Sequence, residues 1–219
     1  MRVKALNILS QFLKDYPGMS TAPCSDAGVY LSGKFRFKAS LCGNDEIEDS
    51  YNLGIFILDK FPKVLPEVVE KDGKIPRNGD FHVNPDGTLC LGSPLRLLKK
   101  VNSAPYLAGF TDKCLVPYLY AVSYKLRYGG DFVFGELAHG DQGIVDDYSS
   151  MLGLQERHQI TQAIQLLGVK KRIANKRPCP CGCGERLGAC PFHHKLNEFR
   201  QMAPVSWFKA HTLNNRNQI

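Results

Sequence analysis

A tight turn followed at once by a cysteine is the feature that most constrains this chain. In Phe81–Leu91 (FHVNPDGTLCL), the stretch Asn84–Gly87 predicts a turn, because proline presets φ at the second position and glycine closes the reversal without strain. Cys90 follows three residues after that glycine, between two leucines, and His82 and Asn84 lie shortly upstream. One loop therefore brings a thiol, an imidazole and a carboxamide together.

This set of groups suits acyl transfer, with Cys90 as the nucleophile and Asn84 as a donor to the developing oxyanion. The alternative is that Cys90 belongs to the core, since free cysteine is among the most buried residue types and both neighbours are leucines. The motif by itself leaves both interpretations open.

The flanking segments predict an α+β fold in which an N-terminal helix precedes an antiparallel sheet. The helix is expected over about Lys4–Asp15, and partial alternation of apolar and polar residues predicts a half-buried strand at Val29–Leu41. The apolar run Tyr51–Leu58 predicts a second strand, and Leu65–Val69 begins another extended segment. Beyond the cysteine, Cys114–Leu126 predicts a helix.

This order of elements and motifs resembles the ubiquitin-conjugating enzyme family. In that family a Tyr/Phe-Pro…Pro step precedes a His-Pro-Asn motif, and a Gly-x-Ile/Leu-Cys-Leu segment holds the thioester cysteine. The matching residues here are Phe61-Pro62, Pro66, His82-Val83-Asn84 and Gly87–Leu91. The resemblance covers about residues 1–127 and implies an N-terminal helix, an antiparallel meander sheet and C-terminal helices.

Three departures separate the chain from the eukaryotic pattern. Val83 replaces the motif proline, the separation between Asn84 and Cys90 is shorter than usual, and Gly92-Ser93-Pro94 stands where a tryptophan is expected. The chain is in these respects more similar to bacterial relatives of the family, several of which sit in antiphage defence operons. The departures leave the role of Asn84 open.

The resemblance implies a cysteine-dependent acyl carrier and transferase. Cys90 would take up a protein C-terminus as a thioester, which a lysine amine would then attack. Asn84 or nearby backbone N–H groups would stabilise the oxyanion, and His82 would hold the loop. The bacterial relatives suggest a cyclic-oligonucleotide synthase as the conjugated protein, or else a ubiquitin-like protein. The sequence shows no glycine-rich nucleotide loop, so a separate activating enzyme or another acyl route is required.

Composition and cysteine usage predict a cytoplasmic protein. The 219 residues can bury a full core, and no apolar stretch approaches the ~18 residues of a membrane span. Met1–Lys4 leads into a mixed helix rather than the core of a signal peptide. In a reducing compartment the eight cysteines are expected to be metal ligands, a catalytic thiol or core residues rather than disulfides.

A second motif, Cys179–Gly184 (CPCGCG) followed by Cys190, predicts a structural zinc site. A glycine-rich knuckle lets nearby thiolates converge on one ion, and zinc prefers four such ligands in a tetrahedron. Four protein ligands leave no open position for catalysis, which indicates a structural role.

The spacing of these cysteines resembles the zinc motif at the carboxy terminus of SecA. Cys179, Cys181 and Cys190 match its first three ligands. Pro191 occupies the usual place of the fourth, so His193 is the expected fourth ligand. Cys183 and His194 remain alternatives.

The net charge of +7 is concentrated in the last fifty residues. Lys170–Ile219 holds ten Lys or Arg and two acidic residues, a net charge of +8. The preceding residues hold 18 Lys or Arg and 19 acidic residues, a net charge of −1. Such a tail can contact nucleic acid or an acidic protein face, or simply be a solvated charge excess. No nucleic-acid-binding motif accompanies it, so nucleic acid is not an expected partner.

Between the two motifs, Tyr128–Gly143 predicts a long glycine-rich loop. His139 in this loop is a candidate base or substrate-orienting residue, although a loop histidine is more often structural. Two short helices, at Ile144–Leu152 and Gln155–Leu167, should follow. The predicted domains are a ubiquitin-conjugating-like domain at 1–168, a basic linker at 169–177 and a zinc module with its tail at 178–219.

The remaining cysteines and two rival functions complete the predictions. Cys114 is expected in the core, Cys24 in a loop and Cys42 near a strand end. One rival is a non-catalytic adaptor of the same fold in which Cys90 is a buried residue. The other is a zinc-dependent nucleic-acid binder that acts through the basic tail. The sequence leaves the acyl donor, the acceptor lysine and the oligomeric state open.

Overall fold

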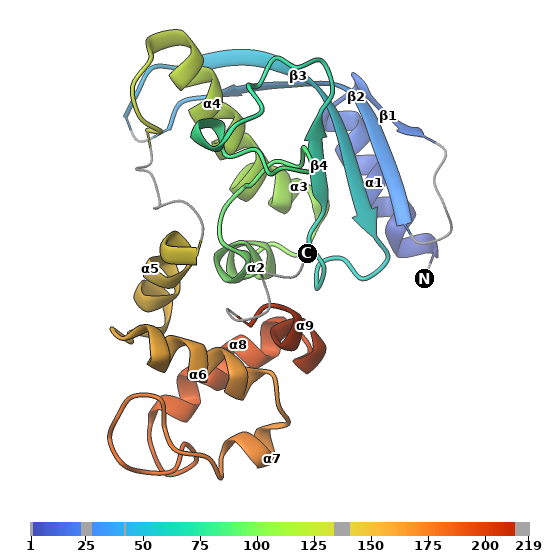
Figure 1. Cartoon of the computed structure of the whole chain (residues 1–219). Helices are drawn as coiled ribbons and strands as arrows, with labels where there is room; N and C mark the ends of the chain where they lie inside the picture. Colours follow the sequence, from blue (N-terminus) through green and yellow to red (C-terminus); the bar gives the residue numbers. More distant parts are fainter. Residues whose placement is uncertain (1, 23–27, 42, 134–140, 213–219) are drawn as a thin grey trace. The chain divides into compact units, whose positions relative to one another are not determined.

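The computed structural model of the chain describes residues 2–22, 28–41, 43–133 and 141–212 (Figure 1). They form two compact units. Unit 1 consists of residues 1–92 and 100–136, and unit 2 of residues 93–99 and 137–219. The predicted His139, Cys24 and Cys42 lie outside the described residues.

Unit 1 is built on a four-stranded antiparallel sheet. Its strands are β1 (Met19–Ala22), β2 (Gly28–Ala39), β3 (Ile47–Leu58) and β4 (Glu67–Glu70), and they pair in the order β1-β2-β3-β4. The long central pair aligns Phe35 opposite Tyr51, so both side chains lie on the same face of the sheet. The α+β class predicted from the sequence is confirmed.

Helices cover that face of the sheet. They are α1 (Arg2–Asp15), α3 (Leu107–Phe110), the π-type turn η2 (Thr111–Leu115) and α4 (Val116–Tyr128). Tyr16, just after α1, stacks on Phe35 with ring centroids 4.4 Å apart. Tyr51 makes a 2.6 Å hydrogen bond to Ser123 of α4. Both helices therefore pack against the face that bears Phe35 and Tyr51, and they bury the core of unit 1 there.

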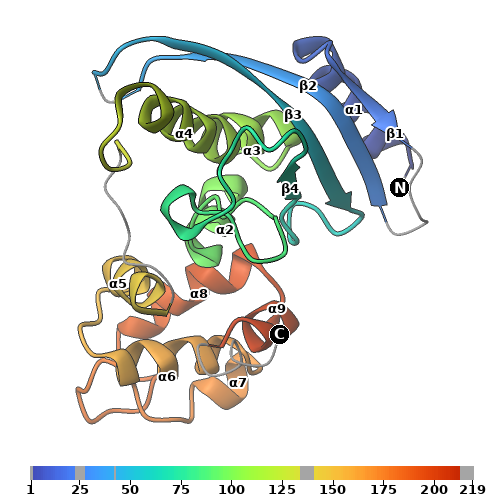
Figure 2. The ribbon, with the colours of Figure 1, turned by 45° about the horizontal axis from the view of Figure 1, so that its top comes forward.

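Unit 2 is helical (Figure 2). It contains the start of α2 (Pro94–Asn102), then α5 (Asp141–Leu152), α6 (Arg157–Leu167), α7 (Lys171–Ala174), α8 (Phe192–Met202) and α9 (Val205–Ala210). One apolar cluster joins these helices, and its members include Leu95, Leu98, Tyr148, Leu152, Ile160, Ile164, Leu167, Ala174, Cys179, Leu187, Cys190, Leu196, Phe199, Trp207 and Phe208. Two cysteines of the predicted zinc motif thus belong to a core.

The compact units do not coincide with the predicted domains 1–168 and 178–219. Helices α5 and α6 share one apolar cluster with the cysteine segment, which groups residues 141–168 with the zinc motif. The predicted linker at 169–177 contains α7, whose Ala174 is completely buried. The basic charge of residues 169–177 suggested a linker between two domains. Burial of apolar surface instead joins the residues on both sides of it in a single core.

The described helices include none that is both long and apolar enough to cross a membrane.

A buried carboxylate ties α5 to the start of α2 within unit 2. Asp147 is 3% exposed and accepts hydrogen bonds from the Ser93 hydroxyl and from Arg96, whose Nε lies 2.6 Å from Oδ1. A buried carboxylate is tolerated because it is fully hydrogen-bonded and paired with a cation. The side chain of Asp146, next along the helix, is exposed instead.

We expect Asp147→Asn to destabilise unit 2 by about 2 kcal/mol or more, because it weakens charge-assisted bonds in a buried site. The matched control Asp146→Asn should change stability by less than about 0.5 kcal/mol. Urea unfolding followed by the fluorescence of Trp207, the only tryptophan and a core residue of unit 2, measures both. Equal stability of the two variants would contradict the role given to Asp147.

Candidate functional site

Cys90 closes a short hairpin whose turn is the one predicted from the sequence. The N–H of Gly87 donates to the carbonyl of Asn84 at 2.9 Å, and the N–H of Asn84 donates to the carbonyl of Thr88 at 2.8 Å. Gly87 has φ +85°, a conformation that favours glycine. The N–H of Cys90 then donates to the carbonyl of His82 at 2.8 Å. The two sides of the hairpin are thereby held in register.

The sheet holds one side of this hairpin. The N–H of Leu89 donates to the carbonyl of Val68 in β4 at 2.8 Å, and Thr88 forms an antiparallel bridge with Val69. Leu89 is 7% exposed, so its side chain anchors the same segment in the core. Cys90 therefore follows directly on a residue that is fixed by both its backbone and its side chain.

Helix α4 holds the other side. The hydroxyl of Tyr118 donates to the carbonyl of Phe81 at 2.7 Å, and Nζ of Lys125 donates to the carbonyl of Asp80 at 3.0 Å. These carbonyls belong to the 3-10 turn η1 (Gly79–Phe81), which enters the hairpin. Two side chains of one helix thus fix the backbone immediately before His82.

His82 acts through its backbone. It is the one non-glycine residue with positive φ (52°) in the part of the chain that the structure describes. Its N–H donates to the carbonyl of Gly79 at 2.8 Å while its carbonyl accepts from Cys90. Its ring meets Phe132 edge-on, with centroids 4.9 Å apart. These contacts agree with the expectation that His82 holds the loop.

The side chain of Asn84 takes part in the turn. Its Nδ2 donates to the hydroxyl of Thr88 at 2.9 Å, and that hydroxyl donates to Asp86 at 2.6 Å. Hydrogen bonds from the hydroxyl and the backbone N–H of Thr88 lower the pKa of Asp86. A carboxamide has two N–H donors, so one remains for another acceptor.

Cys90 differs from the core cysteine of unit 1. Its side chain is partly exposed and forms no disulfide, whereas Cys114 is 1% exposed and burial raises its pKa to about 11. The prediction that Cys114 is a core residue is confirmed. Burial, and after it the negative charge of an ionised Cys90, raises the pKa of Tyr118. The phenol of Tyr118 is therefore within electrostatic reach of the Cys90 sulfur.

The backbone directly after Cys90 offers further donors. Among the described residues, the N–H groups of Leu91 and Gly92 have no hydrogen-bond partner. Unpaired N–H groups beside a nucleophile can accept the negative charge of a tetrahedral intermediate. The site thus combines a partly exposed cysteine with neighbouring N–H donors.

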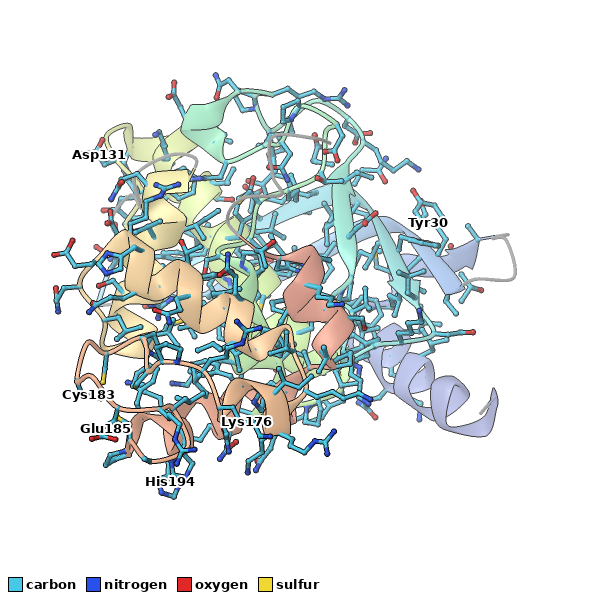
Figure 3. The ribbon with its side chains drawn as sticks, turned by 60° about the horizontal axis from the view of Figure 1, so that its bottom comes forward. Tyr30, Asp131, Lys176, Cys183, Glu185 and His194 are labelled. Atoms are coloured by element: carbon cyan, nitrogen blue, oxygen red, sulfur yellow. The ribbon has the colours of Figure 1, made fainter. Side chains whose placement is uncertain are left out.

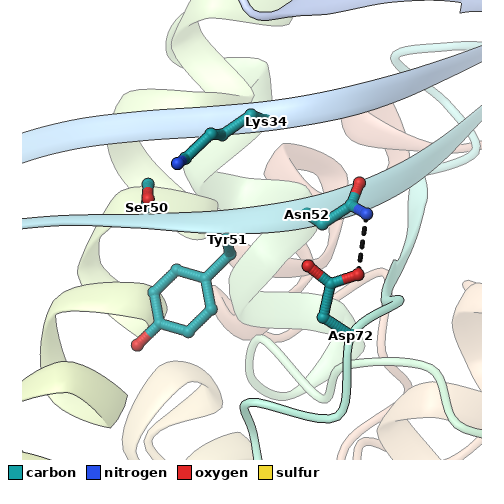
Figure 4. Close-up of a pocket in the computed structure, with 5 residues that line it drawn as sticks. All are labelled: Lys34, Ser50, Tyr51, Asn52 and Asp72. Atoms are coloured by element: carbon teal, nitrogen blue, oxygen red, sulfur yellow. Dashed lines mark hydrogen bonds between the residues drawn. The ribbon is translucent and has the colours of Figure 1, made fainter.

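A separate polar cavity of about 340 Å³ lies on the sheet of unit 1 (Figure 4). Lys34, Ser50, Asn52 and Asp72 line it, and Asn52 donates to Asp72 at 2.8 Å. None of the predicted reactive residues is in its lining, so it is distinct from the cysteine hairpin.

Four cysteines of unit 2 form a second centre. The sulfur atoms of Cys179, Cys181, Cys183 and Cys190 all lie within 4.8 Å of one another, close enough to hold one metal ion. Cys181 is 3.2 Å from Cys179 and 3.6 Å from Cys190 between sulfurs. The intervening Gly182 and Gly184 both have φ +80°, the left-handed geometry that a tight knuckle requires.

The geometry favours Cys183 over His193 as the fourth member of this cluster. His193 lies in the first turn of α8, and its Nδ1 is 2.7 Å from the carbonyl of Cys190. Its ring also packs on His194 at 3.9 Å between centroids. Of the two alternatives to His193, the structure brings in Cys183, because the glycines on either side turn its thiol back toward the others.

Cys179 and Cys181 differ in acidity. Burial raises the pKa of Cys179. At Cys181 burial acts in the same direction, but hydrogen bonds from the Cys179 thiol and the Cys183 backbone outweigh it and lower the pKa to about 7. Thiolates are the form that binds metal, so Cys181 is suited to act as a ligand, whereas binding at Cys179 would require the ion to displace its proton.

Comparison of the chain with protein-family models, with curated proteins and with solved structures gives no match.

Cys90 and Cys114, the two described thiols of unit 1, should react with an alkylating reagent at different rates. We expect iodoacetamide to modify Cys90 at least tenfold faster than Cys114, because Cys114 is buried and its pKa is raised to about 11. Peptide mass spectrometry after timed quenching of the native protein gives both rates. Equal rates, or faster labelling of Cys114, would show that Cys90 is as enclosed as a core residue.

Proposed function

We propose that this protein is a cysteine-dependent acyl carrier and transferase of the ubiquitin-conjugating type. The observation that supports the proposal best is Cys90 itself, a partly exposed thiol at the end of a hairpin that β4 and α4 hold from two sides. A cysteine that served only to fill the core would be expected to be buried, as Cys114 is at 1% exposure.

The order of elements in unit 1 supports a ubiquitin-conjugating-like fold. An N-terminal helix is followed by a four-stranded antiparallel meander, then by the His82–Asn84 turn, Cys90 and the helix α4. The chain also has a Phe61-Pro62 step ahead of β4, where the family has its aromatic-proline step. The proposed catalytic residues are Cys90, Asn84 and, as a positioning residue, His82.

The proposed chemistry has two balanced steps. In the first, the Cys90 thiolate attacks the activated carboxyl terminus of a protein, an acyl adenylate or a carrier thioester. A new C–S bond forms, the acyl C–O bond to AMP or the C–S bond to the carrier breaks, and AMP or the carrier thiolate leaves. In the second, a lysine amine attacks the thioester; a C–N bond forms, the C–S bond breaks, and the amine loses a proton to solvent. The N–H groups of Leu91 and Gly92 and the second amide hydrogen of Asn84 are the donors available to the oxyanion.

The partners follow from this chemistry. The donor is a protein with a free C-terminus, by resemblance a cyclic-oligonucleotide synthase or a ubiquitin-like protein, within a bacterial antiphage system in the cytoplasm. A separate activating enzyme loads Cys90, or the acyl group reaches it by another route. The acceptor is a lysine amine.

We propose further that the four-cysteine cluster holds a structural Zn²⁺ ion. Cys179 and Cys190 are at the same time members of the unit 2 core, so a bound ion would join the knuckle to that core. Four thiolates complete a tetrahedron and leave no position for substrate. The ion would stabilise the fold and take no part in acyl transfer.

The transferase proposal is tested with Cys90→Ser and Cys90→Ala chains co-expressed with the neighbouring genes. A serine at this position should retain the acyl group as a stable oxyester, whereas wild type should show an adduct that thiols remove. Intact-mass spectrometry measures both and identifies the attached protein from the added mass. Cys114→Ser serves as the matched control and should behave as wild type.

One result would reject the transferase and leave the adaptor of the same fold. This result is the lack of any adduct on wild type and on Cys90→Ser, together with full function of Cys90→Ala in the cell.

Metal content tests the second proposal. We expect about one Zn²⁺ per chain, bound tightly enough to survive gel filtration. Cys183→Ser should lose the ion to a chelator far more readily than wild type, and His193→Gln should keep it. Elemental analysis gives the stoichiometry. Loss from His193→Gln with retention by Cys183→Ser would instead identify His193 as the fourth ligand.

A further inference from the structure

Basic residues flank the cysteine knuckle of unit 2, which we define as Cys179–Cys190. Six of them are exposed, and none has a hydrogen-bond or ion-pair partner for its side chain among the described residues. We call this set the knuckle-flanking basic surface; it consists of Lys170, Lys171, Arg172, Lys176, Arg177 and Arg186. The one acidic residue within residues 170–190 is Glu185.

Backbone hydrogen bonds join the two segments that bear these cations. Arg177 accepts at its carbonyl from the N–H of Leu187 at 2.8 Å, and Pro178 forms a bridge with Arg186. The carbonyl of Asn175, just after α7, accepts from Gly188 at 3.0 Å. The basic helix α7 is thus tied to Arg186–Gly188, which follow the cysteine loop; Figure 3 labels Lys176 of the basic segment and Cys183 and Glu185 of the loop.

The chemistry of the surface favours nucleic acid over an acidic protein. Phosphate contacts need only cations, and guanidinium groups bind phosphate oxygens with two donors each. Protein interfaces generally bury apolar or aromatic anchors at their centre. In the described part of unit 2, Ile173 is the one large apolar side chain that is exposed, at 44%. The surface therefore has the charge for a phosphate backbone and little apolar area for a protein.

Polar donors extend the surface along α6. Gln162 donates to the carbonyl of Pro178 at 3.2 Å, which places this part of α6 next to the knuckle. Thr161, Gln162 and Gln165 line an open hollow of about 520 Å³, together with Glu156, Arg157 and His158. Hydroxyl and amide groups of this kind contact phosphate and sugar oxygens in nucleic-acid complexes.

We propose that the knuckle-flanking basic surface binds the phosphate backbone of nucleic acid without reading its sequence. The inference is independent of Cys90, because the surface belongs to unit 2. It gives the chain a binding activity in addition to the proposed acyl transfer. The surface presents no described aromatic side chain for base stacking, so binding should be electrostatic and strongly dependent on salt.

The test uses the full chain and a fluorescein-labelled 20-base-pair DNA duplex, with anisotropy measured from 50 to 200 mM KCl. We expect the logarithm of the affinity to fall linearly with the logarithm of salt, with a slope of about −3 to −5 for three to six neutralised phosphates. The triple variant Lys171→Gln, Arg172→Gln, Lys176→Gln should bind about tenfold or more weakly and lose about 2 to 3 units of slope. Its three side chains are exposed, so folding should not change.

A matched control removes the same charge from unit 1. Lys14→Gln, Lys60→Gln, Lys63→Gln changes three exposed lysines far from the knuckle in sequence, and it should bind nearly as wild type does. Cys90→Ala should also bind as wild type, so loss of acyl transfer and loss of duplex binding are separate results. Poly-glutamate tests the acidic-protein alternative as a competitor.

Three outcomes overturn the proposal. Wild type does not bind the duplex at 50 mM KCl; or the unit 1 control loses as much affinity as the triple variant; or poly-glutamate displaces the duplex at equal or lower charge concentration. The last outcome would assign the surface to an acidic protein.

Discussion

Two backbone hydrogen bonds determine where the Cys90 sulfur lies, and the proposed chemistry depends on them. The N–H of Leu89 is bound to Val68 in the sheet, and the N–H of Cys90 is bound to His82 across the hairpin. A shift of one residue in this register would exchange the faces on which Leu89 and Cys90 lie. The thiol would then be buried and a leucine exposed. The register therefore decides whether Cys90 is partly exposed or buried in the core.

The hairpin is held in a form that costs conformational energy. His82 has a left-handed backbone, which is unfavourable for a residue with a side chain. The surroundings compensate for this, since Tyr118 and Lys125 of α4 bind the two carbonyls ahead of it. Strain of this kind persists only where neighbouring contacts over-determine the backbone. The strained backbone at His82 indicates that the placement of Cys90, eight positions later, is a specific requirement.

Unit 2 combines a core, a metal-ligand cluster and a basic surface within one short stretch of chain. Cys179 and Cys190 contribute to both the apolar cluster and the thiol cluster, so packing and metal binding would reinforce each other. Backbone pairing of Arg177 with Leu187 and of Pro178 with Arg186 joins the basic segment around α7 to the chain after the cysteine loop. In the sequence these cations are only part of a basic tail. In the structure they belong to the folded part of unit 2 and form the knuckle-flanking basic surface.

The sequence predicts the local features well, because they depend on short-range rules. The turn at Asn84–Gly87, the strands β2 and β3, and the helices α1, α4, α5 and α6 lie within a few residues of their expected positions. The four-residue strand β1 was missed because too few residues show its alternation. The helix α2 was also missed, although Pro94 at its first position is a typical start signal.

Features that depend on long-range packing could not be predicted in the same way. The exclusion of His193 from the thiol cluster follows from the start of α8 and its bond to the Cys190 carbonyl, which spacing alone does not reveal. The unit boundaries follow from an apolar cluster that joins residues more than a hundred positions apart, such as Leu95 and Trp207. The bond between Asn84 and Thr88 depends on the rotamer that the finished turn selects.

The measurement that tests the central structural claim most directly is amide hydrogen exchange at the hairpin, followed by nuclear magnetic resonance on the native protein. If the hairpin is a fixed part of the sheet unit, the N–H groups of Leu89 and Cys90 should exchange about as slowly as those of β3. The N–H of Leu91, which has no described partner, should exchange much faster and serves as the internal control. Exchange of Leu89 and Cys90 as fast as that of Leu91 would show that the hairpin is not held, and the proposed placement of the thiol would fail.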